Sequence, residues 1–110
     1  MCIVLHPQRF NESEVIYEED YHPHEMYFIS NGRCSYIYQS YIYKTLVKGS
    51  YFGEIEILFG TGRLNTVAAD VDTEIELLSL DKDDLRKILE EYPSVAKEMK
   101  EIAEIKMSKN

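Results

Sequence analysis

The segment Tyr51–Val67, YFGEIEILFGTGRLNTV, is the most informative part of this chain. A glycine and an acid, Gly53 and Glu54, precede a short apolar run, and a glycine-flanked turn then leads to Arg63. An unpaired buried charge is too costly to tolerate, so an arginine in so apolar a stretch needs an anionic partner. Glu54 is one candidate partner, which would make a purely structural ion pair.

A second interpretation of the same segment is a cradle for a phosphate. Gly53 permits close approach of a ligand to the backbone. Residues 55–59 are long enough for a single helical turn, whose first amides are available to an anion. The glycines that follow allow a tight return that brings Arg63 back over those amides. On this interpretation Glu54 is left to accept a hydrogen bond from a sugar hydroxyl.

Length, charge and cysteine content limit the classes of protein to consider. A chain of 110 residues forms one domain, and a net charge of −8 excludes a general phosphate-tracking surface for nucleic acid. Cys2 and Cys34 are too few for a disulfide scaffold, which favours reduced thiols in a cytosolic setting. We find neither a transmembrane run nor a signal peptide, and we expect a single domain from a larger protein.

Residues of about 10–80 show the pattern of a β protein. Short β-branched or aromatic runs are separated by turn residues, and they are Val15–Tyr17, Met26–Ser30, Cys34–Tyr38, Tyr41–Val47, Thr66–Ala69 and Ile75–Leu80. Asn31 and Gly32 both tolerate positive φ and predict a hairpin between the runs that flank them. Four tyrosines are expected to pack in the core and across strands, namely Tyr36, Tyr38, Tyr41 and Tyr43.

After Leu80 the hydrophobic period becomes helical. Asp81 is expected to cap a helix over residues 82–92 that Pro93 ends, and Ser94 to cap a second helix over residues 94–108. The apolar stripe of the second helix is predicted to be Val95, Met99, Ile102 and Ile105. Strands followed by helices favour an α+β fold, a small roll or sandwich with helices packed at one end.

The opening segment resembles the phosphate-binding cassette of cyclic-nucleotide-binding domains, whose pattern is F-G-E-[IL]-x-L-[LI], a short gap, then R-[TS]-A-[ST]-V. The matching residues, without gaps, are Phe52, Gly53, Glu54, Ile55, Arg63, Thr66 and Val67. EVIYEEDYHPHEMYFISNGRCSYIY upstream and LLSLDKDDLRKILEEYPSV downstream resemble two further motifs of the family. The three motifs occur in the family's order and cover nearly the whole chain.

The resemblance implies an eight-stranded antiparallel β-roll, jelly-roll-like, with a short cassette helix, a hinge helix and a lid helix. Its ligand would be cAMP or cGMP, with no other cofactor. Glu54 would bind the ribose 2′-hydroxyl and Arg63 the cyclic phosphate. Backbone amides near Ile55 and Asn65 would complete the cradle.

The lid helix would contribute the remaining ligand contacts. The position that often carries a purine-contacting arginine in ion-channel members falls on Lys106, beside Met107. Occupancy would be relayed by a population shift in which the lid docks its Val95, Met99 and Ile102 side.

The chain departs from the family pattern inside the cassette. Leu64 replaces a threonine common in channel members, which removes a hydrogen bond worth about 0.5–1.5 kcal/mol, and Asn65 replaces an alanine. Loss of the Arg63 charge would cost more, about 2–5 kcal/mol. We therefore expect binding to survive, with a weakened or altered preference between cAMP and cGMP. Asp20 and Pro23 replace glycines in the first turn, and both suit a turn.

These features predict a non-enzymatic sensor that gates a cation channel, in particular a potassium channel, from the cytoplasmic side of the plasma membrane. The parent protein would be a tetramer and this 110-residue chain a monomer. The alternatives are a regulatory domain of a cyclic-nucleotide-dependent kinase and a non-binding, self-liganded channel domain. A metal-binding cupin is the enzyme-class rival because of His22, His24 and Glu25, but the ligand spacing fails, and we expect no metal site.

Overall fold

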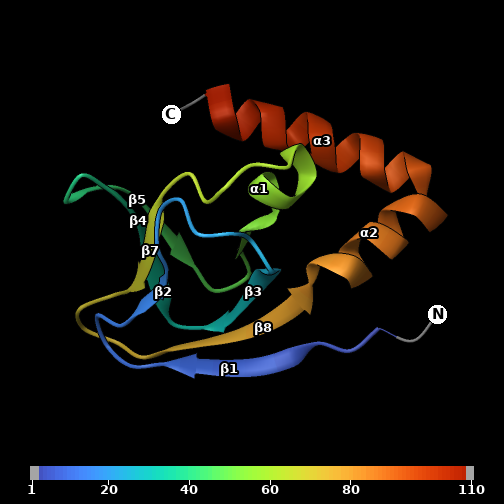
Figure 1. Ribbon diagram of the computed structural model, residues 1–110. Helices are drawn as coiled ribbons and strands as arrows, with labels where there is room; N and C mark the ends of the chain where they lie inside the picture. The colour runs from blue at the N-terminus through green and yellow to red at the C-terminus, as the bar shows by residue number, and fades with distance from the viewer. Residues whose placement is uncertain (1–2, 109–110) are drawn as a thin grey trace.

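A computed structural model describes residues 3–108 as two sheets and three helices (Figure 1). Cys2 lies outside the described residues. The strands are β1 (His6–Phe10), β2 (Val15–Tyr17), β3 (Glu25–Asn31), β4 (Arg33–Tyr38), β5 (Tyr41–Val47), β6 (Tyr51–Phe52), β7 (Thr66–Ala69) and β8 (Ile75–Asp81). The helices are α1 (Glu54–Phe59), α2 (Lys82–Glu91) and α3 (Pro93–Ser108).

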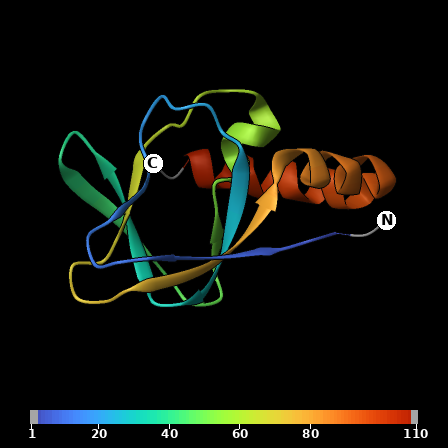
Figure 2. The same ribbon diagram turned by 60° about the horizontal axis from the view of Figure 1, so that its bottom comes forward.

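The eight strands form two four-stranded antiparallel sheets, ordered β1-β8-β3-β6 and β2-β7-β4-β5. This confirms the predicted eight-stranded antiparallel roll and the α+β class. Two strands, β1 and β6, were missed as separate runs, because β1 contains Pro7 and charged residues and β6 has only two residues. Figure 2 shows the helices gathered at one end of the roll.

Inward-facing apolar side chains from both sheets form the core of the roll. Its buried members are Tyr17, Tyr27, Ile29, Cys34, Leu46, Phe52, Val67, Ala69, Ile75 and Leu77. Burial raises the pKa of the Cys34 thiol to about 12, so Cys34 is a protonated core residue. A second cluster attaches the helices to the roll and is centred on Met26, Ile57, Leu80 and Leu85, with Met99 packed against it.

The helix boundaries lie close to the expected ones. Asp81 caps α2, and its side chain accepts a hydrogen bond from the Asp83 amide. α3 begins at Pro93 and not after Ser94. Proline is favourable at the first helical position because the amide hydrogen that it lacks would have no partner within the helix there. Among residues 3–108, no helix has both the length and the apolar character needed to cross a lipid bilayer.

The docked face of α3 differs from the predicted stripe. Ala103 is fully buried and Met99 is half-buried, whereas Val95, Ile102 and Ile105 are exposed. Small alanines allow the helix to lie close to the roll, so its contact face is Ala96, Met99, Ala103 and Lys106. The prediction that Val95 and Ile102 dock is therefore wrong.

The predicted Asn31–Gly32 hairpin is also wrong. β3 and β4 belong to different sheets, so the chain turns a corner there from one sheet to the other. Gly32 is required because its φ is +88° and a Cβ would collide with the Glu74 carbonyl oxygen. The true two-residue hairpin joins β4 to β5 through Gln39 and Ser40, both at positive φ.

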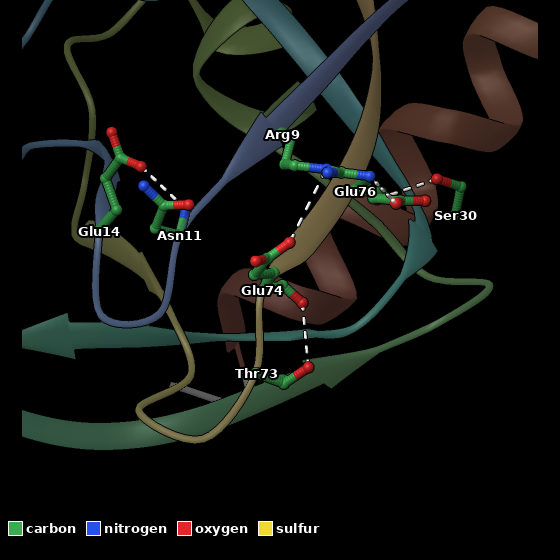
Figure 3. A network of polar contacts seen from close by, with 7 residues as sticks. All are labelled: Arg9, Asn11, Glu14, Ser30, Thr73, Glu74 and Glu76. Atoms are coloured by element: carbon green, nitrogen blue, oxygen red, sulfur yellow. Dashed lines mark hydrogen bonds and ion pairs between the residues drawn. The ribbon is translucent and has the colours of Figure 1, made fainter.

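Exposed polar contacts link the edge strand β1 to its neighbour β8 and to the residue just before β8. Arg9 on β1 lies 2.8 Å from the Glu76 carboxylate and 3.8 Å from that of Glu74 (Figure 3). These side chains are largely exposed, so the contacts contribute little stability. They lie on a strand pair outside the cassette.

Candidate functional site

The cassette starts at Gly53, where the backbone takes a conformation that favours glycine. Its φ is 86°, and a Cβ there would lie 3.2 Å from the Arg63 Nη1 atom. The next residue, Glu54, begins α1, and Gly60 ends that helix in the left-handed region. Glycine at position 53 therefore allows the Arg63 guanidinium to lie directly against the backbone.

Arg63 is held almost entirely inside the protein. Its Nη1 donates to the Gly53 carbonyl at 2.8 Å and to Glu56 Oε1 at 2.9 Å, and its Nη2 donates to the Glu25 carbonyl at 2.6 Å. The guanidinium carbon lies 4.0 Å from the centroid of the Tyr17 ring. Three of the five guanidinium N–H donors are thus used within the protein.

The carboxylate that pairs with Arg63 is Glu56, and not Glu54, which was one candidate partner in the sequence. Glu54 and Glu56 are two residues apart on α1, so they point to roughly opposite sides of the helix. Glu56 faces Arg63 and also accepts a hydrogen bond from the Leu64 amide at 3.2 Å. Glu54 faces α3.

Glu54 pairs with a residue of the lid helix. Lys106 Nζ lies 2.8 Å from Glu54 Oε2, and the Glu54 side chain is only 2% exposed. The same ammonium lies 4.0 Å from the centroid of the Tyr51 ring. The structure thus brings together two predicted site residues that are 52 positions apart in the sequence.

A cavity of about 820 Å³ lies between the cassette, the β4–β5 hairpin and the end of α3. Its size is within the range of about 300–1,000 Å³ typical of small-molecule sites. Six of the eight predicted site residues line it: Gly53, Ile55, Leu64, Asn65, Lys106 and Met107. Glu54 and Arg63 do not line this cavity, and Arg63 borders a second cavity of about 470 Å³. Tyr17 lines both cavities.

Tyrosines form much of the cavity wall, and four of these were expected from the sequence only to pack in the core and across strands. The residues concerned are Tyr17, Tyr36, Tyr38, Tyr41 and Tyr43, with Lys44 beside them. The signal was their spacing, because residues two apart on a strand face the same side and the runs at 36–38 and 41–43 are adjacent in the sheet. Burial raises the pKa of Tyr36 and Tyr43, so both hydroxyls stay protonated at neutral pH.

Asn65 replaces the family's alanine and makes a polar contact at the cavity wall. Its Nδ2 donates to the Tyr43 hydroxyl at 2.7 Å. Its Oδ1 is buried and has no hydrogen-bond partner within the described chain. Leu64 is exposed and lines the same wall.

The histidines considered for a metal site lie on the turn before β3. The rings of His22 and His24 are 5.2 Å apart, and His22 Nε2 lies 3.0 Å from Lys82 Nζ. The Lys82 ammonium lowers the pKa of His22. Within residues 3–108, no group of three or more histidine, cysteine, aspartate or glutamate side chains is arranged to hold a metal ion.

Residues 7–92 match the family model described as the cyclic nucleotide-binding domain. The chain belongs to this family. The matched segment contains the cassette, Glu54 and Arg63, so the resemblance seen in the sequence is confirmed.

Relatives of this cyclic nucleotide-binding domain include two human ion channels. The chain is 35% identical over 94 residues to the potassium/sodium hyperpolarization-activated cyclic nucleotide-gated channel 1, with 86% of this chain covered. It is 34% identical over 103 residues to the potassium/sodium hyperpolarization-activated cyclic nucleotide-gated channel 4, with 94% of this chain covered. The matches span only 10% and 8% of those channels.

Solved structures of kinase regulatory proteins have the same fold. The regulatory domain of Toxoplasma gondii PKA, crystallised with cAMP, superposes with a TM-score of 0.78 at 17% identity, covering 91% of this chain and 39% of that one. The second structure is a mutant regulatory subunit of a cAMP-independent protein kinase A from Trypanosoma brucei, bound to cAMP. It superposes with a TM-score of 0.72 at 24% identity, covering 76% of this chain and 30% of that one. At these identities the likeness establishes the fold.

Proposed function

We propose that this domain binds a cyclic purine nucleotide, cAMP or cGMP, in the 820 Å³ cavity, without catalysing a reaction. The observation that carries the proposal is the convergence of the cassette and the end of α3 on one cavity of suitable size. Cassette and α3 residues that are at least 41 positions apart (Asn65 to Lys106) line it together, as they would if a nucleotide bound between the roll and the lid. Membership of the cyclic nucleotide-binding family supports the same ligand class.

The chain's own residues supply a group for each part of a nucleotide. Arg63 borders the second cavity, which shares Tyr17 with the 820 Å³ cavity, and it retains two N–H donors beyond the three used inside the protein; these are assigned to the phosphate. Glu54 is assigned to the ribose 2′-hydroxyl, since a carboxylate accepts several hydrogen bonds. The tyrosines at the cavity wall and Met107 provide apolar surface for the base.

The proposed role is regulatory and is relayed through α3. Identity to the two channels supports a domain that gates a cation channel, in particular a potassium channel, from the cytoplasmic side as part of a tetramer. The fold shared with PKA regulatory proteins supports the alternative of a kinase regulatory domain.

One observation favours a non-binding, self-liganded domain as the second candidate. Both charged residues assigned to the nucleotide are already paired within the protein, Arg63 with Glu56 and Glu54 with Lys106. A ligand has to share or replace these partners, which lowers its net gain in free energy.

Titration calorimetry with cAMP and cGMP separates the two candidates. We expect the wild type to bind and Arg63→Ala to lose about 30-fold or more in affinity, because a buried charge contact is worth about 2–5 kcal/mol. Leu64→Thr adds a hydroxyl at the cavity wall and should raise affinity about threefold to tenfold. Arg86→Ala is the matched control, since Arg86 is exposed and its weak partner is Asp83.

The outcomes are distinct. No binding by the wild type at millimolar nucleotide would refute the proposal and leave the self-liganded domain. Equal affinity of the wild type and a folded Arg63→Ala, checked by circular dichroism, would refute the role of Arg63 while leaving ligand binding itself.

A further inference from the structure

The last turn of α3 places a cation on the cassette. Lys106 Nζ donates to Glu54 Oε2 at 2.8 Å and lies 4.0 Å from the centroid of the Tyr51 ring. The Lys106 side chain is 27% exposed and that of Glu54 is 2% exposed. We call this Lys106–Glu54 contact the latch.

The latch matters because Glu54 is buried. A buried carboxylate without a counter-charge is strongly unfavourable. The neighbouring arginine cannot serve, since Arg63 lies on the other side of α1 and is paired with Glu56. While α3 is docked, the compensating charge for Glu54 therefore comes from α3, and the Lys106–Glu54 ion pair is broken whenever α3 moves away.

Packing along the same face of α3 adds to the latch. Ala103 is fully buried, and Met99 packs against the cluster that joins the helices to the roll. The ribbons show α3 lying alongside α1 in both views (Figures 1 and 2). Most helical stability in proteins comes from tertiary packing of this kind, so contacts along this face stabilise the 16-residue α3.

We propose that Lys106 is a built-in ligand of the cassette that keeps α3 docked without a nucleotide. In the sequence, Lys106 was expected to contact the purine. The geometry assigns its ammonium to Glu54, the carboxylate that would otherwise bind ribose. The lid of this domain is thereby biased towards its docked position by the chain itself. This inference concerns the chain alone and holds whether or not the proposed nucleotide binds.

Hydrogen–deuterium exchange of the full 110-residue chain, with no nucleotide present, tests the latch. We expect the α3 amides of the wild type to be protected and those of Lys106→Met to exchange about tenfold faster. Methionine keeps an apolar stem but removes the ammonium, and with it the hydrogen bond to Glu54 and the cation–ring contact with Tyr51. Glu54→Gln should have the same effect on α3.

Two further variants make the result specific. Lys106→Arg keeps the positive charge and should retain the protection. Lys97→Met removes an exposed lysine from the same helix and should leave exchange unchanged. Rapid exchange of α3 in the wild type, or equal exchange in Lys106→Met and Lys97→Met, would overturn the proposal. These exchange rates are measured without nucleotide and do not depend on nucleotide affinity. Failure of the proposed function would instead be detected by calorimetry.

Discussion

Arg63 and Glu56 depend on each other at the level of single residues. Their side chains are 2% and 4% exposed, so neither charge is stabilised by water. Arg63 also satisfies two backbone carbonyls, of Gly53 and Glu25. The residue assigned to the phosphate is therefore also a structural residue of the roll.

Arg63→Ala should lower the free energy of unfolding by about 3–5 kcal/mol, because it leaves the Glu56 carboxylate buried without a counter-charge. Arg63→Met combined with Glu56→Gln removes both charges and should be less destabilised than Arg63→Ala. Urea unfolding followed by circular dichroism measures both. Arg9→Ala, in an exposed ion pair, should cost less than about 1 kcal/mol. Equal losses for Arg63→Ala and Arg9→Ala would contradict the structural role.

The sequence predicted the cassette because its residues are contiguous and each has a distinct chemical role. It could not predict the partner of Arg63, since Glu54 and Glu56 are both near Arg63 in sequence and only the direction of their side chains on α1 separates them. It also could not show that Tyr36 and Tyr43 line a cavity. That depends on the pairing of β4 with β5 and on the position of α3 beyond them.

At the level of elements, the latch determines how strongly α3 can respond to a ligand. A ligand shifts an equilibrium only by its difference in affinity for the two positions, and an already docked helix has little further to shift. In Lys106→Met, α3 should be undocked more often at rest. A nucleotide could then increase the docked fraction of α3 by a larger amount.

We predict that saturating cAMP or cGMP slows the hydrogen exchange of α3 more in Lys106→Met than in the wild type. The expected slowing is about tenfold in Lys106→Met and about twofold or less in the wild type. Hydrogen–deuterium exchange with and without nucleotide measures the ratio, and Lys97→Met should respond like the wild type. A large nucleotide effect in the wild type would show that the latch does not hold α3.

Sequence patterns identified the elements better than the connections between them. Asn31 and Gly32 have the composition of a hairpin but occupy a corner between the two sheets. Gln39 and Ser40 form the real hairpin at φ of 50° and 65°, in residues that seldom adopt positive φ, so composition gave no signal. The docked face of α3 was misjudged because alanines pack closely while larger apolar residues remained exposed.

At the level of the whole molecule, the roll and its order of helices were predictable because three motifs spanned the chain. The acidic surface belongs to the same level, since a net charge of −8 opposes self-association. The exposed apolar side of α3 favours self-association instead. It is formed by Val95, Ile102 and Ile105.

We predict that charge prevails and that the 12.9 kDa chain is a monomer at micromolar concentration. Sedimentation velocity at low and high salt measures the mass. A dimer that dissociates in Ile105→Lys would contradict the prediction and identify the exposed side of α3 as the interface.

The junction between sheet and helices confines where the molecule can bend. Asp81 is both the last residue of β8, paired with Glu25, and the cap of α2, so no loop separates that strand from that helix. Tyr92 alone stands between α2 and α3, and the ring of Pro93 fixes the next φ. The backbone torsions of Tyr92, whose aromatic ring is exposed, are therefore where α3 can change its direction relative to α2.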